Sequence, residues 1–237
     1  MPANKTDNTD GTNSTSGTNG THDTKGTHST KGTHGTHDTN AGGSALALLV
    51  EEVGKRSALL TSGEHGAFVG SELPIVDRAL SRILAEGLAR GPVFCEWGSG
   101  LGGACGVAAL HGFTALGIEI QRELVDSARV LAENLSLPLV FAEGTFLLPG
   151  DEDLVGTATD HTELTFDSCA WDEMDLTPAD CDVIFAYPWP GEEEMVDRIF
   201  ARHASAEALL VTFHDFGRAL VQRKLHHQKD LRTLGWM

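Results

Sequence analysis

The chain has 237 residues, of which 41% are hydrophobic, so its length and composition suit one domain with a sizeable core. Its formal net charge is -17 at pH 7, which repels nucleic acid and favours neutral or cationic ligands. Solubility or adaptation to salt explains the same charge, so the charge by itself assigns no function.

The sequence contains no stretch that approaches the roughly 18 consecutive apolar residues of a membrane-spanning helix. Its polar start also lacks the apolar region of a signal peptide. The four cysteines show no C-x-x-C spacing, which favours buried thiols over disulfides or a metal site. We therefore expect a cytoplasmic protein that binds no metal and contacts no membrane.

Residues 1–43 consist almost entirely of Thr, Gly, Asn, Asp, Ser, His and Lys. So few apolar side chains cannot offset the entropy lost on ordering, and we expect a disordered tail. Its histidines are expected to be solvated rather than metal-bound. The sequence thus divides into a tail, residues 1–43, and one folded domain, residues 44–237.

Two helices are predicted before the first strand. One begins near Ser44, and the other follows Ser71, a plausible N-cap before Pro74 in the first turn. Their apolar positions are Leu46, Leu48, Leu49, Val50 and Val53 in the first, and Ile75, Leu80, Ile83 and Leu84 in the second. These helices either close over a ligand or serve only as packing elements.

Residues 93–103 carry the most informative pattern, an apolar strand followed by a glycine-rich turn and a helix of small residues. Gly98, Gly100 and Gly102 let the backbone turn sharply and approach a ligand. The spacing Gly-x-Gly-x-x-Gly also fits a dinucleotide site, although such a match is weak evidence. Glu96, just before the turn, would repel a pyrophosphate and suit a cationic ligand.

The run Glu96-x-Gly98-x-Gly100-x-Gly102 resembles the first motif of the class I, Rossmann-like, S-adenosylmethionine-dependent methyltransferases. The cofactor of that family carries an ammonium and a sulfonium. The resemblance implies that S-adenosyl-L-methionine is held by Glu96, Ser99 and the three glycines.

A second strand is predicted over residues 114–120, so that Glu119 stands at its end, about 20 residues beyond the turn. Doubly wound folds place an acid there to accept hydrogen bonds from a ribose diol. A helix from Gln121 and a third strand over residues 139–142 follow. By resemblance to the family, Thr145 and Phe146 are expected beside the adenine ring, through a hydroxyl or by stacking.

Residues 147–179 are predicted to form an extended loop with one short helix. A fourth buried strand then runs into Tyr187-Pro-Trp189-Pro, where the two prolines stiffen an aromatic loop. Its position matches the fourth motif of the family, which implies that Tyr187 and Trp189 line the acceptor site. An aromatic loop that only covers the core is the alternative. Glu192 is the candidate general base for an acceptor that arrives protonated.

A helix over residues 192–203, a fifth strand over 209–213 and a final hairpin over 219–225 and 231–236 complete the chain. This alternation predicts an α/β fold, a doubly wound, mostly parallel sheet of the seven-stranded type with helices on both faces. The implied function is methyl transfer to an unidentified acceptor, a small molecule or a protein side chain. A nicotinamide-dependent oxidoreductase, or a non-catalytic cofactor-binding module that engages a basic partner, is the alternative.

Overall fold

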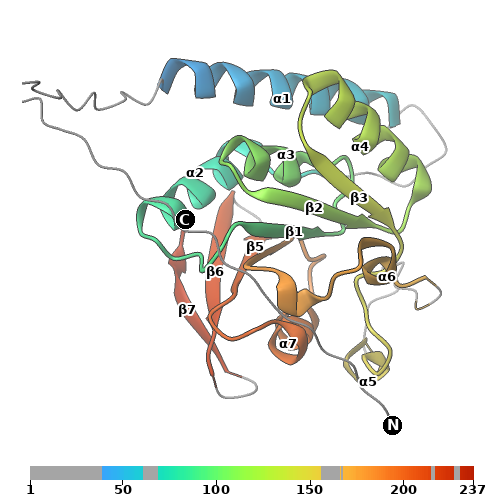
Figure 1. Ribbon diagram of the computed structural model, residues 1–237, viewed down its shortest axis with the longest axis vertical. Coiled ribbons are helices and arrows are strands. Elements are labelled where there is room, and N and C mark those ends of the chain that lie inside the picture. The colour runs from blue at the N-terminus through green and yellow to red at the C-terminus, as the bar shows by residue number, and fades with distance from the viewer. Residues whose placement is uncertain (1–38, 61–68, 156–165, 167, 215–216, 227–229) are drawn as a thin grey trace, which may run out of the picture. The chain divides into compact units, whose positions relative to one another are not determined.

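The computed structural model describes residues 39–60, 69–155, 166, 168–214, 217–226 and 230–237 (Figure 1). The predicted tail lies almost wholly outside these residues. The strands are β1 (Val93–Trp97), β2 (Thr114–Glu119), β3 (Leu139–Glu143), β4 (Val183–Ala186), β5 (Leu209–His214), β6 (Arg218–Lys224) and β7 (Leu231–Trp236). The helices are α1 (Thr39–Leu60), α2 (Leu73–Ala85), α3 (Gly103–Leu110), α4 (Arg122–Leu135), α5 (Glu152–Val155), α6 (Ala170–Met174), the 3-10 helix η1 (Pro178–Asp180) and α7 (Glu193–His203).

The strands form one seven-stranded sheet in the order β3-β2-β1-β4-β5-β6-β7. Strands β1 to β5 are parallel, and β6 and β7 run antiparallel to their neighbours as the predicted final hairpin. From β1 the chain moves outwards to β2 and β3, then returns to place β4 on the other side of β1. Sheets of this kind bind ligands beyond the carboxyl ends of the strands at that reversal. The predicted fold class is confirmed, and it directs attention to the ends of β1 and β4.

Successive strand residues point to opposite faces of the sheet and so enter two apolar cores. Along β1, Phe94 joins the core beneath α1, α2, α3 and α4. Its neighbour Cys95 and then Trp97 join the core beneath α5, α6 and α7. Figure 1 shows these two groups of helices on opposite faces of the sheet. Burial on both faces explains why the central strands read as continuous apolar runs.

Two glycines of α3 allow the elements before β1 to pack closely. A Cβ added at Gly106 would lie 2.8 Å from the end of Leu49 in α1, and one at Gly103 would lie 2.9 Å from Leu73. Both leucines are buried. We call α1 together with residues 69–73 the N-terminal arm. The arm therefore reaches the first turn of α3, which directly follows the glycine turn.

Both helices before the sheet differ from the sequence prediction. Helix α1 begins at Thr39, ahead of Ser44, and its main contacts are with α3 and α4. Leu48 and Val50 of this helix are exposed. Helix α2 has Glu72 rather than Ser71 as its N-cap, because the Glu72 carbonyl accepts the first helical hydrogen bonds. Ser71 is thereby released for another role.

Residues 147–179 hold α5, α6 and η1, more helix than the one short segment predicted, while residues 156–165 and 167 lie outside the described residues. The cysteines are free, and all except the partly buried Cys169 are buried, as expected. Within the described part of the chain, no helix combines the length and apolar character needed to cross a membrane.

Candidate functional site

The glycine turn joins β1 to α3 in a conformation that only glycine adopts readily. Gly98, Gly100 and Gly102 have φ of +69°, +52° and +74°. Side chains strain the backbone in this left-handed region. Gly102 is restricted further, because a Cβ there would lie 2.4 Å from the ring of Phe141. The path of the chain therefore favours glycine at all three positions.

Glu96, the last residue but one of β1, caps the helix that follows the turn. Its Oε2 accepts a hydrogen bond from the backbone N–H of Cys105 at 2.9 Å, in the first turn of α3. The carboxyl group is buried, and burial raises its pKa from 4.5 to about 7. Hydrogen bonds from Cys105 partly oppose that rise in pKa, and the negative charge of Glu119 adds to it. The site thus contains a buried carboxylate at a helix N-terminus.

Glu119 ends β2 at the same edge of the sheet, as its spacing predicted. Its Oε2 accepts a hydrogen bond from the N–H of Gly100 at 2.8 Å, and its Oε1 accepts one from the N–H of Gln121 at 3.0 Å. The carboxylate therefore ties the middle of the glycine turn to the end of the neighbouring strand. This positioning role was not foreseen from the sequence, which offers only the spacing.

Ser99 lies inside the turn, and its hydroxyl group is unusual in its hydrogen bonding. Its backbone N–H donates to the carbonyl of Ile118 at 2.8 Å. The side chain is buried, yet its Oγ has no hydrogen-bond partner among the described residues. Buried polar groups nearly always have a partner, so an orphaned hydroxyl here fits a site that a polar ligand completes.

Thr145 and Phe146 follow β3 at the same edge but are engaged elsewhere. The Thr145 hydroxyl accepts from the N–H of Leu147 at 3.1 Å, and the Thr145 N–H donates to Ser168 at 2.7 Å. The Phe146 ring stacks on Trp97 with centroids 4.8 Å apart. Neither side chain lines the pocket described next. Their contact with an adenine ring stays a prediction.

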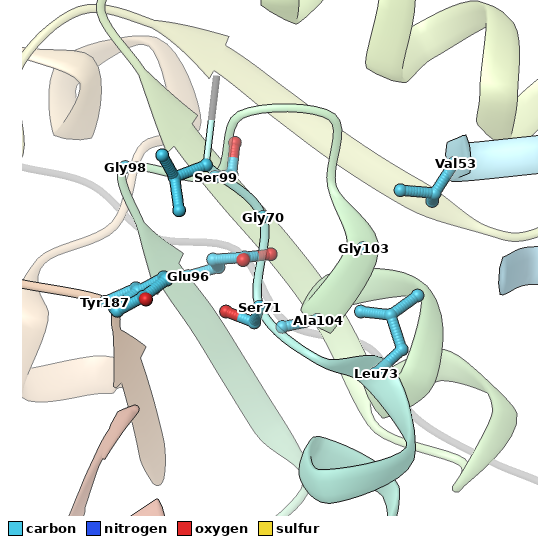
Figure 2. Close-up of a pocket in the computed structure, with 11 residues that line it drawn as sticks. Val53, Gly70, Ser71, Leu73, Glu96, Gly98, Ser99, Gly103, Ala104 and Tyr187 are labelled. Atoms are coloured by element: carbon cyan, nitrogen blue, oxygen red, sulfur yellow. The ribbon is translucent and has the colours of Figure 1, made fainter. Parts of the chain in front are cut away.

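A small pocket, part of it open to solvent, lies beside the glycine turn (Figure 2). It is lined by Val53, Val69, Gly70, Ser71, Leu73, Glu96, Gly98, Ser99, Gly103, Ala104 and Tyr187. The lining brings together the end of β1, the start of α3, the residue after β4 and the N-terminal arm. Among the described residues that line the pocket, Glu96 is the one with a charged side chain.

The three residues predicted for catalysis separate in the structure. Tyr187 lines the pocket, and its ring packs edge-on against Phe213 with centroids 4.8 Å apart. Trp189 is 47% exposed and does not line this pocket. Glu192 is buried at the N-cap of α7, where its Oε2 accepts from the N–H of Trp189 at 3.3 Å. That the two prolines stiffen this loop stays a prediction, while the different surroundings of Tyr187 and Trp189 separate the two aromatic side chains.

Sequence reasoning missed the contribution of the N-terminal arm to this pocket. Val53 and Val69 supply apolar wall, and Ser71 supplies a hydroxyl. Ser71 had been interpreted as a helix cap, and its local sequence gives no sign of a ligand site. The small residues of α3 were the available signal, because Gly103 and Gly106 lie beyond the turn and admit a close neighbour.

Comparisons with known proteins give likeness of fold only. No protein-family model matches the chain, and no curated protein does either. An RNA methyltransferase from Salinibacter ruber, solved with S-adenosyl-L-homocysteine, is similar at 24% identity over 61% of this chain and 76% of its own, with a TM-score of 0.41. A putative O-methyltransferase from Klebsiella pneumoniae is similar at 17% identity over 71% and 64%, with a TM-score of 0.42. A SAM-dependent methyltransferase from Thiobacillus denitrificans, in complex with S-adenosyl-L-homocysteine, is similar at 19% over 65% and 51%, with a TM-score of 0.38. Likeness at this level assigns no activity.

Proposed function

We propose that this chain is an S-adenosylmethionine-dependent methyltransferase of class I. The observation that carries the proposal is the buried Glu96 carboxylate at the N-terminus of α3, inside a glycine turn that borders a pocket. A ligand in this pocket lies beside the negative charge of the ionised Glu96 carboxylate. The ammonium and sulfonium of the cofactor suit that charge, because an opposite charge nearby stabilises both partners in a buried site.

The same carboxylate argues against a nicotinamide dinucleotide. A dinucleotide site places the pyrophosphate on the N–H groups of the helix that follows the glycine turn. Here Glu96 already accepts from the N–H of Cys105 in that first turn. A pyrophosphate would lose this donor and meet a carboxylate instead, so the oxidoreductase alternative is disfavoured.

The rest of the cofactor site follows from the ends of β2 and β3. Glu119 is the proposed partner of the ribose diol, since a carboxylate can accept about four hydrogen bonds and its bonds to Gly100 and Gln121 are compatible with others. Ser99 offers a buried hydroxyl to a polar group of the ligand. Phe146 is the proposed neighbour of the adenine ring.

Methyl transfer asks little acid–base chemistry of the protein, because the bound sulfonium is already activated. The chain has to hold the acceptor in line with the methyl group and to exclude water. Tyr187 is our candidate for contact with the acceptor, since it lines the same pocket as Glu96 and the glycine turn. Glu192, as a base, has weaker support because it caps α7 and does not line this pocket.

Titration calorimetry of the full chain with S-adenosyl-L-homocysteine and with NAD⁺ tests the proposal. We expect a one-to-one complex with the first and no heat of binding with the second. Binding of NAD⁺ without binding of S-adenosyl-L-homocysteine would contradict the proposal and favour the oxidoreductase alternative. Labelled S-adenosylmethionine, bound but never turned over with any acceptor pool, would favour the non-catalytic module.

A further inference from the structure

The side chain of Cys105 lies between the carboxyl group of Glu96 and the neighbouring strand β2. Cys105 belongs to the first turn of α3, and its backbone N–H donates to Glu96 Oε2 at 2.9 Å. Its thiol donates to the carbonyl of Leu116 in β2, with Sγ and the oxygen 3.1 Å apart. The Glu96 carboxyl group is a second hydrogen-bonding neighbour of the same thiol. One residue of α3 therefore contacts both β1 and β2.

The Cys105 thiol has one proton, and two oxygen acceptors compete for it. Burial raises the pKa of this thiol well above its usual value, and the negative charge of Glu96 adds to the rise. The thiol therefore keeps its proton at neutral pH and remains a donor. An ionised carboxylate accepts a stronger hydrogen bond than a neutral carbonyl does. Rotation about the Cβ–Sγ bond should thus turn the thiol from Leu116 to Glu96 once Glu96 is ionised.

This second acceptor matters because a buried carboxylate needs donors to stay ionised. Three donors from the described residues face Glu96, namely the backbone N–H groups of Ala104 and Cys105 and the Cys105 thiol. Of these three, only the thiol belongs to a side chain. The Cys105 side chain is fully buried, so a residue without a donor at this position would leave part of the carboxylate unsatisfied.

We propose that Cys105 is a positioning residue, whose thiol donates to Leu116 while Glu96 is protonated and to Glu96 once the carboxylate forms, so that the carboxylate is held ready for the ammonium of the cofactor. The consequence for the cofactor rests on the proposed function, whereas the contact between the thiol and Glu96 does not. The thiol keeps its proton throughout and takes no part in methyl transfer.

Other ionisable groups also face Glu96 from the elements around it. Burial is the main cause of the raised pKa of Glu96, and the negative charge of Glu119 in β2 adds to it. Cys95 precedes Glu96 in β1, and Tyr187 lines the same pocket after β4. These groups are the same in every variant used below, so an effect that follows the residue at position 105 reports on the thiol.

Urea melts of the ligand-free protein test the contact itself. Without the thiol donor, the titration of Glu96 in Cys105→Ala should move upwards by about 0.5 to 1 pH unit. The fall in unfolding free energy that Glu96 causes should then continue beyond pH 7, so the stability lost in Cys105→Ala should grow between pH 6 and pH 8. Cys105→Ser keeps a donor and should restore most of the wild-type pH dependence.

Two controls separate this effect from packing. In the Glu96→Gln background, Cys105→Ala should cost the same stability at every pH, because nothing at position 96 titrates. Cys181→Ala truncates another buried cysteine, whose thiol lies beside Thr177 and Cys95, and its cost should also be independent of pH. A loss in Cys105→Ala that is the same at pH 6 and pH 8 would show a packing role alone and would overturn the proposal.

Calorimetry with S-adenosyl-L-homocysteine tests the consequence for the cofactor. At pH 6.5 the affinity of Cys105→Ala should be about three- to tenfold lower than that of the wild type, because less Glu96 is ionised, and the difference should shrink to about twofold at pH 8.5. Cys181→Ala should match the wild type at both pH values. Equal weakening of Cys105→Ala at both pH values would contradict the positioning role. A wild-type chain that fails to bind the ligand would refute the methyltransferase proposal, while the urea melts would still decide the contact.

Discussion

Replacing Glu96 by Gln should make the ligand-free protein more stable and the cofactor complex weaker. The folded protein holds the Glu96 proton up to a pKa of about 7, against 4.5 for an ordinary carboxyl, because the group is buried. The stability that this proton confers is complete below pH 4.5 and is lost as the pH rises to about 7. At about 1.4 kcal/mol per pH unit, the ionised carboxylate costs the fold about 3 kcal/mol.

Glutamine removes this cost, since its amide stays neutral and its oxygen can still accept from Cys105. The advantage in unfolding free energy of Glu96→Gln over the wild type should therefore grow by about 2 to 3 kcal/mol between pH 5 and pH 8. Urea melts of both proteins at several pH values measure it, with the exposed Glu133→Gln as control. An advantage that is the same at pH 5 and pH 8 would show that Glu96 does not titrate in this range.

The same titration predicts how ligand affinity varies with pH. An ammonium group beside Glu96 favours its ionised form, so binding of S-adenosyl-L-homocysteine through its ammonium should release a proton below pH 7 and tighten as the pH rises through 7. Glu96→Gln should bind about tenfold or more weakly at pH 8, because one charge-assisted contact is lost, and should lose the pH dependence. Calorimetry in buffers of different ionisation heat counts the released proton.

Three further predictions concern the turn, the arm and the aromatic loop. Glu119→Ala should weaken S-adenosyl-L-homocysteine about ten- to a hundredfold by calorimetry, since it removes a charge-assisted partner, and unchanged affinity would remove Glu119 from the site. Gly106→Val should lower the free energy of unfolding by about 1 to 3 kcal/mol, because the valine side chain overpacks against Leu49. Urea melts of the double variant with Leu49→Ala should recover part of that loss. Purely additive losses in the double variant would contradict the contact. Tyr187→Ala should keep cofactor affinity within a few-fold and lower turnover about a hundredfold. The Trp189 side chain is half-exposed, so Trp189→Ala should change the melting temperature little. A fully active Tyr187→Ala protein would remove Tyr187 from the acceptor site.

The parts of the site that the sequence predicts are those set by local geometry. Gly98, Gly100 and Gly102 predict a turn because glycine tolerates positive φ, and each of the three has a positive φ in the structure. The position of Glu119 was predictable because the number of residues from the glycine turn to the end of the second strand varies little in such folds. The carboxyl ends of parallel strands also lie at one edge of the sheet. The alternation of predicted strands and helices along the chain likewise gave the fold class.

The parts that the sequence does not predict depend on contacts between distant segments. Ser71 reaches the pocket only because Leu73 docks on Gly103, a contact that no local pattern records. The Thr145 N–H donates to the carbonyl of Ser168, a residue more distant in the sequence than any local pattern covers. The neighbours of Trp189 in the sequence could not show whether it lines a pocket, because exposure depends on how the loop after β4 packs on the rest of the fold.

A crystal structure of the full chain with S-adenosyl-L-homocysteine tests the central claim most directly. We predict that the amino-acid end of the ligand lies against Glu96 and Ser99, with the ribose hydroxyls within hydrogen-bond distance of Glu119. Tyr187 should lie beside the ligand's sulfur, where an acceptor has to approach the methyl group. A ligand bound elsewhere, or with its amino-acid end remote from Glu96, would contradict the account.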